Sequence, residues 1–163
     1  HIPRQGRLAD LDNIEEISAI AQDHPNVNII LAHIGRAYCP ENIGEGLKRL
    51  KKFDNIFYDL AMVNNEEVIE ILLREVGPEK VLFGTDLPVA QVRGKMICIN
   101  GQRQFITREP YFWSLPNPQA KIKCTYFAYE IIRALKKAAK RIGLSRRKIE
   151  LIFYGNGKRL LKS

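Results

Sequence analysis

The sequence predicts an α/β fold in which parallel strands alternate with outer helices, and three observations support it. Apolar strands are expected to begin near residues 27, 55 and 80, which gives repeats of 28 and 25 residues. Helical patterns fill the intervals between these strands. Polar residues stand where each strand ends. A regular strand–helix repeat is typical of a parallel sheet whose crossover helices pack outside it.

The repeat occupies the first ninety residues. Asp10 or Asp12 can cap a helix that ends near His24. The apolar run over 27–33 has the look of a strand buried on both faces. The elements expected next are a helix over 43–52, a strand over 55–60, a helix over 66–76 that Gly77 and Pro78 stop, and a strand over 80–84.

The strand–helix repeat ends after Asp86. Asn100 and Gly101 between extended flanks predict a β-hairpin with a type I′ turn, because both residue types accept positive φ. Since the hairpin follows the last strand, it would project over the active-site face. The remaining expected elements are an aromatic loop over 110–116, a long helix over 118–142, and two short helices capped by Ser145 and Asn156.

The size of the chain limits the architecture. Its 163 residues suffice for one domain with a core, but a whole (β/α)₈ barrel usually needs about 250. Doubly wound sheets share the same repeat. A barrel is favoured because His33, Asp59 and Asp86 each end a separate strand, where barrel active sites are assembled. The chain opens on His1 rather than Met, so we expect an N-terminal portion, with the earlier strands, to be missing.

Charge divides the chain into two regions. Residues 1–90 hold 9 Lys/Arg and 15 Asp/Glu, and residues 91–163 hold 17 and 3. A basic section can meet nucleic acid or an acidic membrane surface. The favoured interpretation is a solvated helix face that also contacts an acidic neighbour, because the basic residues near 133–141 alternate with apolar ones at helical spacing. No nucleic-acid-binding motif accompanies them.

Cysteine usage and hydropathy bear on the compartment. Cys39, Cys98 and Cys124 are scattered and odd in number, which argues against a disulfide framework or a cysteine zinc site. A cytoplasmic location is therefore expected. No apolar run reaches the ~18 residues of a membrane span.

Two strand-end residues are the main catalytic candidates. Asp86 follows the run Val81–Thr85 and would point into the barrel mouth, where it could bind a divalent metal and accept a proton from its water. A helix cap or turn aspartate is the alternative. His33 could act as a metal ligand or as an acid or base near neutral pH. The alternative for His33 is a core histidine.

Other residues are weaker candidates. His1 could be a third ligand or base, or only the remnant of a tag or cleavage. Arg4 and Arg36 could each hold a substrate carboxylate through paired N–H donors, or could form surface ion pairs. Asp59 is equally consistent with capping, and His24 with a structural role at a helix end.

Four segments, in this order, carry a family resemblance: His1–Arg4, Leu31–Gly35, Leu82–Pro88 and Tyr154–Leu161. Together they resemble the amidohydrolase superfamily, and most closely its amidohydrolase-related branch, which includes decarboxylases and lactonases. The resemblance covers nearly the whole chain and implies the C-terminal half of a metal-dependent hydrolase barrel, with a hairpin and C-terminal helices added. The family's first-strand His-x-His pair is absent, and Gly157 replaces a usual alanine.

The resemblance implies roles for three residues. His1 would end the fifth barrel strand as a metal ligand, His33 the sixth as a ligand or catalytic histidine, and Asp86 the eighth as a ligand and proton acceptor. The implied cofactor is a divalent metal, zinc first. The implied substrate is a small amide, ester, lactone or cyclic carboxylate attacked by a metal-activated water. Supplying the missing N-terminal half would be a condition for activity.

Three further hypotheses remain open at this point. One is a non-oxidative decarboxylase of the same superfamily, and another is a non-catalytic barrel fragment or binding module. The third is a nucleic-acid-associated protein that uses the basic region, which the lack of a motif disfavours. The partners expected are a small-molecule substrate and no membrane. Exposed aromatic residues such as Phe112 and Trp113 suggest a homo-oligomer.

Overall fold

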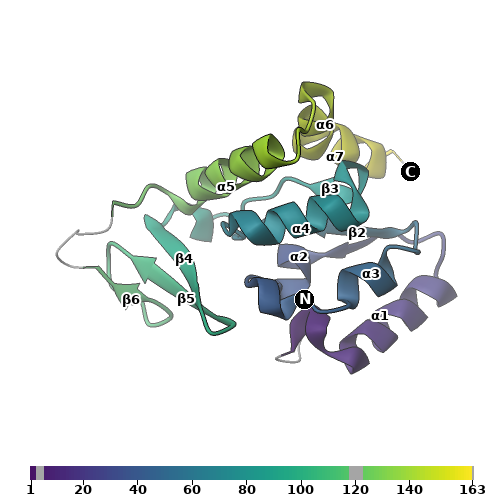
Figure 1. The fold of residues 1–163 in the computed structure, drawn as a ribbon, viewed down its shortest axis with the longest axis horizontal. Helices are drawn as coiled ribbons and strands as arrows, with labels where there is room; N and C mark the ends of the chain where they lie inside the picture. Colours follow the sequence, from purple (N-terminus) through teal and green to yellow (C-terminus); the bar gives the residue numbers. More distant parts are fainter. Residues whose placement is uncertain (3–5, 118–122, 163) are drawn as a thin grey trace.

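Two sheets lie in separate parts of the molecule, and a long helix, α5 (Phe127–Arg141), runs past both (Figure 1). The structure is a computed structural model, and it describes residues 1–2, 6–117 and 123–162. The first sheet is parallel and belongs to the acidic region. The second contains the hairpin and belongs to the basic region.

The parallel sheet has three strands in the order β1-β2-β3. β2 pairs with β1, and β3 pairs with β2. Its strands are β1 (Ile29–Leu31), β2 (Ile56–Asp59) and β3 (Val81–Leu82). All three are shorter than expected, but they confirm an α/β fold with parallel strands. Consecutive strands that are direct neighbours, without a reversal of order, are what a barrel wall requires.

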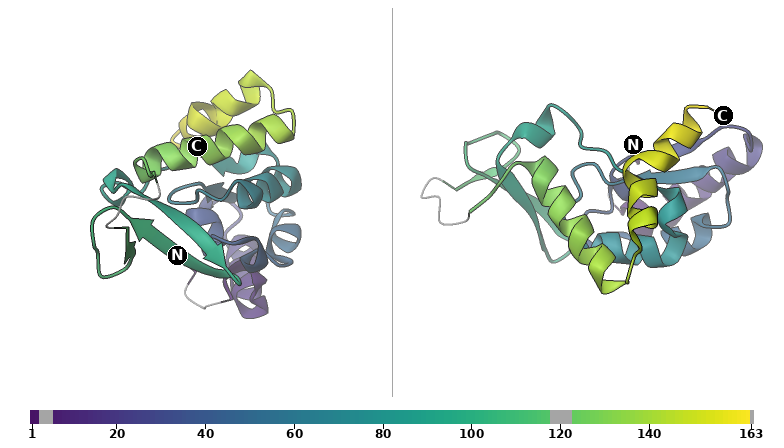
Figure 2. Two further views of the ribbon diagram at one scale, coloured as in Figure 1. Left: turned by 60° about the vertical axis from the view of Figure 1, so that its left-hand side comes forward. Right: turned by 90° about the horizontal axis from the view of Figure 1, so that it is seen from above.

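Outer helices follow the strands around the sheet. They are α1 (Leu11–Asp23), α3 (Gly46–Leu50) and α4 (Glu66–Val76). α1 contacts α3, α3 contacts α4, and α4 contacts α5, so the helices form a continuous layer (Figure 2). Asp10 is the cap of α1, since its carboxylate accepts from the Asn13 N–H at 3.1 Å. The buried faces of these three helices include Ile14, Leu47, Leu50, Val68, Ile69 and Leu72.

The hairpin forms where the sequence predicted it. β4 (Gly94–Ile99) runs antiparallel to β5 (Gln102–Thr107). The turn residues Asn100 and Gly101 have φ of 51° and 72°, which agrees with the expected type of turn. The aromatic loop contains a short strand that the sequence did not indicate, β6 (Leu115–Pro116), parallel to β5.

The C-terminal helices differ in part from expectation. The long helix begins at Phe127 rather than near 118, and residues 118–122 lie outside the described ranges. Ser145 caps α6 (Arg146–Glu150), as predicted. Asn156, expected to cap α7 (Asn156–Leu160), is fully buried and donates instead to the Pro78 and Val81 carbonyls, both at 2.8 Å. It thereby ties the chain's end to β3.

Short helical turns complete the described residues. Four are 3₁₀ turns, at Arg7–Ala9, Pro40–Asn42, Pro78–Lys80 and Val89–Gln91, and a π turn spans Leu151–Gly155. No helix within the described ranges is both long and apolar enough to cross a membrane.

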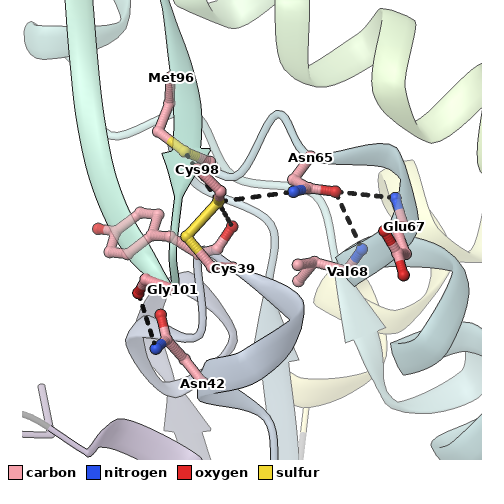
Figure 3. The surroundings of a disulfide bond; sticks show 9 residues. Cys39, Asn42, Asn65, Glu67, Val68, Met96, Cys98 and Gly101 are labelled. Carbon is pink, nitrogen blue, oxygen red and sulfur yellow. Dashed lines mark hydrogen bonds between the residues drawn. A yellow bond between two sulfur atoms is a disulfide. The ribbon is translucent and has the colours of Figure 1, made fainter.

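A disulfide joins the two regions, which the sequence did not predict. Cys39 and Cys98 lie 59 positions apart but are bonded, with their Cα atoms 5.8 Å apart (Figure 3). The expectation of no disulfide was wrong because the pairing arises when β4 folds back onto the segment after β1, and no local pattern encodes that contact. Cys124 is free. The cysteines therefore no longer favour a reducing compartment.

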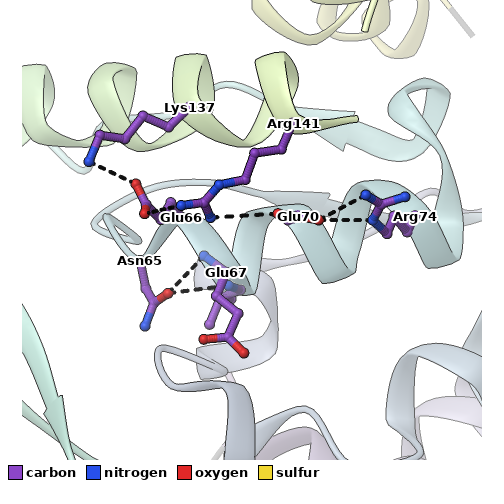
Figure 4. Close-up of polar contacts among 8 residues, drawn as sticks. Asn65, Glu66, Glu67, Glu70, Arg74, Lys137 and Arg141 are labelled. Carbon is purple, nitrogen blue, oxygen red and sulfur yellow. Dashed lines mark hydrogen bonds and ion pairs between the residues drawn. The ribbon is translucent and has the colours of Figure 1, made fainter. Parts of the chain in front are cut away.

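Ion pairs also join the two regions, between α4 and α5. Glu66 accepts from Lys137 at 2.9 Å and from Arg141 at 2.6 Å, and Arg141 reaches Glu70 at 3.6 Å (Figure 4). The acidic neighbour expected for the basic helix is therefore α4 of the same chain. Part of the basic excess is neutralised within the molecule.

Candidate active site at the carboxyl ends of the parallel strands

The chain leaves β1 through a left-handed turn that contains His33. In this turn, α2 (Ala32–Arg36), four successive residues have positive φ: 56° at His33, 53° at Ile34, 60° at Gly35 and 61° at Arg36. Each non-glycine residue in this region costs on the order of 1–3 kcal/mol, and such strain concentrates at functional sites. His33 thus lies two residues beyond the strand that it was expected to close.

Asp59 holds this turn in place. Its Oδ1 accepts from the His33 backbone N–H at 2.8 Å and from the Ala61 N–H at 3.0 Å. A Cβ added at Gly84, just after β3, would stand 3.8 Å from the Asp59 Cβ. The ends of all three strands therefore meet at Asp59. The sequence singled out this aspartate only weakly, and the structure shows it positioning His33.

The His33 ring is buried and has a defined tautomer. Its Nδ1 lies 2.8 Å from the Ala61 carbonyl oxygen, which can only accept, so Nδ1 carries the proton. In the neutral ring the other nitrogen, Nε2, then carries the lone pair. A neutral imidazole held through Nδ1–H to a carbonyl is the arrangement seen in metal-binding and base histidines.

His1 lies beside His33, with the ring centroids 4.9 Å apart in an edge-on arrangement. Two adjacent imidazoles are chemically suited to zinc, but a catalytic zinc site needs three protein ligands. No group of three His, Cys, Asp or Glu side chains suited to a metal occurs among the described residues. The described part of the chain therefore offers an incomplete ligand set for the implied metal.

Asp86 stands apart from the two histidines. It follows β3 with φ of 69°, its side chain is exposed, and its backbone carbonyl accepts from the Ala90 N–H at 3.2 Å. The structure thus brings His1 and His33 together and leaves Asp86 at the same edge of the sheet without joining it to a ligand cluster. Its predicted roles as ligand and proton acceptor remain predictions.

The hairpin contacts the site through Tyr38. The Tyr38 ring stacks on His33 with centroids 5.7 Å apart, and Phe105 of β5 meets it edge-on at 6.2 Å. Trp113 packs edge-on against Phe105 at 5.5 Å. These contacts agree with the expectation that the hairpin lies over this face. The sequence did not single out Tyr38, since an aromatic residue in a loop carries no periodic signal.

Nearby positive and negative side chains both influence the pKa of Tyr38. Burial raises the pKa of its phenol, Arg103 and Arg36 oppose that rise, and the carboxylates of Asp86 and Asp59 add to it. The hydroxyl is therefore protonated at neutral pH. The same charges show that the arginines and the strand-end carboxylates lie around one side chain.

The two arginines proposed to hold substrate have different outcomes. Arg4 lies outside the described residues. Arg36 ends the left-handed turn, and its Nη1 donates to the Ile2 carbonyl at 3.3 Å. That bond ties the chain's N-terminal residues to the His33 turn. A role for Arg36 in substrate binding remains a prediction.

Comparisons with known proteins agree with this fold. The amidohydrolase family model matches residues 5–162. Two solved structures of an amidohydrolase from Burkholderia multivorans, one with bound zinc and one with bound HEPES, each align with a TM-score of 0.55 and 14% identity. The alignments cover 91% of this chain and 49% of theirs, so the chain spans about half their length. At this identity they show the fold alone. No curated protein matched.

Proposed function

The chain belongs to the amidohydrolase family, and we propose that it carries part of the active site of a metal-dependent hydrolase. The substrate class is a small amide, ester, lactone or cyclic carboxylate. The observation that carries the proposal is the buried His33 ring, whose Nδ1 is fixed on the Ala61 carbonyl and whose Nε2 keeps a lone pair. The Asp59 carboxylate holds the backbone on both sides of this contact, because it accepts from the His33 and Ala61 N–H groups.

The rest of the barrel is part of this proposal. β1 pairs only with β2 within the described chain, and Ile30 on β1 and Ile20 on α1 remain about half exposed, at 48% and 52%. An unpaired strand edge beside exposed apolar side chains is an aggregation hazard unless it is covered. We infer that the remaining strands of a (β/α)₈ barrel cover it, with the fifth strand, which would end at His1, beside β1; this agrees with the 49% coverage of the solved structures.

The residues present have separate roles in the proposed reaction. His33 would bind the metal or exchange a proton through Nε2, and Asp86 would accept the proton of the attacking water. Arg4 and Arg36 orient an anionic group of the substrate. A divalent metal, zinc first, would lower the pKa of a bound water when His1, His33 and Asp86 are joined by ligands from the rest of the protein.

Metal content and hydrolysis by the intact protein test this function. We expect a near-stoichiometric divalent metal and turnover of a panel of lactones and esters. Asp86→Asn should slow turnover by about 10²–10⁴-fold, since it removes the proton acceptor. The matched control is Asp54→Asn, because Asp54 is exposed and precedes β2, at the opposite edge of the sheet. Absence of metal together with full activity in Asp86→Asn would sink the proposal.

The same assay separates the alternatives. Release of carbon dioxide from a cyclic carboxylate, without hydrolysis, would assign the decarboxylase reaction instead. A folded protein without metal or turnover would be the binding module. A cytoplasmic location, a homo-oligomer and the lack of nucleic-acid or membrane partners also remain predictions.

A further inference from the structure

A polar pocket lies where the hairpin tip meets the segment after β1. Its volume is about 250 Å³, and its lining residues are Arg7, Asn42, Gly101, Gln102 and Arg103. These residues come from three separate stretches of sequence, so no motif indicated the pocket. It is distinct from the group formed by His1 and His33.

The walls of this pocket are tied to each other. The Asn42 side-chain amide donates to the Gly101 carbonyl at 3.2 Å, which joins the turn of the hairpin to the opposite wall. The disulfide between Cys39 and Cys98 stands three residues from each partner of that bond, and Figure 3 shows both links side by side. A pocket with fixed walls loses little conformational entropy when a ligand binds.

Positive charge gathers at the pocket. Burial lowers the pKa of the Arg7 guanidinium, and the charges of Arg36 and Arg103 lower it further, so the three cations lie within reach of one another. Within the described ranges, no ion pair joins Arg36 or Arg103 to a carboxylate. Like charges held together favour an anion between them.

Arg103 connects the pocket to the candidate active site. Its guanidinium lies over the Tyr38 ring at 4.6 Å and over Phe105 at 6.0 Å. Stacking on the aromatic faces leaves the edge N–H groups of the guanidinium to bind a ligand. The Tyr38 ring also stacks on His33. One side chain therefore contacts both Arg103 and His33.

We propose that this pocket binds a small oxyanion, a carboxylate or phosphate, through Arg7 and Arg103, with Asn42 and Gln102 as polar partners. That this group is part of the substrate rests on the proposed hydrolase function; the binding itself does not. Guanidinium groups suit both oxyanions because they donate paired hydrogen bonds. The hydrolase would then act on anionic substrates that place the charge at the hairpin and the scissile bond near His33.

Equilibrium binding to the intact protein tests the pocket without turnover. Calorimetric titrations with inorganic phosphate and with acetate should each give saturable binding of one equivalent, and the tighter of the two identifies the preferred oxyanion. Arg103→Gln should weaken binding about tenfold to a hundredfold, the usual range for hydrogen bonds to a charged group. Unchanged affinity in Arg103→Gln, or no saturable binding of either anion, would overturn the proposal.

A second variant distinguishes loss of anion binding from loss of folding, because Arg103 also packs on Tyr38. Gln102 is exposed, so Gln102→Glu adds a negative charge to the wall without disturbing that stack, and it should also weaken binding. The matched control is Gln22→Glu on α1, which is also exposed and makes the same charge change. Equal loss in both glutamate variants would contradict a local pocket.

Turnover then separates the two proposals. If the protein hydrolyses esters, Gln102→Glu should raise KM for a carboxylate-bearing ester by a larger factor than KM for its neutral analogue. Anion binding without any hydrolysis would reject the hydrolase and keep the pocket. Hydrolysis without anion binding would reject the pocket and keep the hydrolase.

Discussion

Residues 1–90 and residues 91–163 differ in charge and in how far apart in the sequence their contacting segments lie. The first region is acidic and consists of strand–helix units, each of which packs on the one before it. The second is basic and consists of a hairpin, a long helix and short helices that pack on the first. In the first region sequence neighbours are also spatial neighbours, and in the second most anchoring contacts span dozens of residues.

Three kinds of contact anchor the second region to the first. The disulfide joins β4 to the segment after β1, ion pairs join α5 to α4, and the Asn156 amide joins α7 to the start of β3. Both proposed sites lie at this boundary, because Tyr38 and Arg103 come from opposite sides of it. The comparison teaches that the second region completes and positions a site whose strand-end groups belong to the first.

The largest expected effect comes from the buried aromatic centre of the second region. Phe127 is fully buried and meets Phe105 edge-on at 5.7 Å. Phe127→Ala should cost about 3–5 kcal/mol of unfolding free energy, because it leaves a cavity. Leu72→Ala, also fully buried but in the first region, is the matched variant. If the regions unfold as one unit, urea titrations followed by circular dichroism show both variants shifting a single transition.

Two separate unfolding transitions would show that the two regions do not unfold as one cooperative unit. A shift of only one phase by Phe127→Ala, with the other moved only by Leu72→Ala, would mean that the regions fold independently. The active site would then be assembled by docking rather than by folding.

The disulfide should have the next largest effect. Replacing Cys39 and Cys98 together by Ser should lower the unfolding free energy by about 2–4 kcal/mol, since the bond restrains a long loop in the unfolded chain. Cys124→Ser, at the free cysteine, is the control and should retain wild-type stability. Adding dithiothreitol should lower the midpoint of the wild type and the control, and leave the double variant unchanged. A wild-type midpoint insensitive to reductant would contradict the bond.

The smallest effect is expected at the ion pairs between α4 and α5. The hydrogen bond from Lys137, with a further one from Arg141, lowers the pKa of Glu66 below its ordinary 4.5, while burial opposes that shift. A depressed folded pKa stabilises the protein above pH 4.5, and the stabilisation is lost as the pH falls through the lowered value. Glu66→Gln should therefore cost about 0.2–1 kcal/mol at pH 7, and less in acid or high salt.

Glu67→Gln is the control for this prediction. Glu67 is the next residue in the first turn of α4, so it experiences the same helix dipole. It is exposed, and the part of the chain that the structure describes provides no ion-pair partner for it. Equal destabilisation of both variants at pH 7 would assign the effect to the helix end rather than to the contact with α5.

The candidate site was predictable only in part. His33 and Asp86 could be proposed because an isolated polar residue after an apolar strand is a local signal. Asp59 was ambiguous, since its bond to the His33 N–H joins residues 26 positions apart. Tyr38 and Arg103 carried no signal at all. Their importance comes from stacking on one another across 65 positions of sequence, which no period of 2 or 3.6 residues records.

The sequence by itself determined the order and type of the main strands and helices, because periodicity, caps and turn residues act over a few positions. The helix over 66–76, the Asn100–Gly101 turn and the Asp10 and Ser145 caps all follow from such short-range chemistry. Only the tertiary structure decided the disulfide, the tautomer of His33 and the arginine pocket. Each requires that segments distant in sequence pack together, and the free energy of that packing belongs to the whole chain.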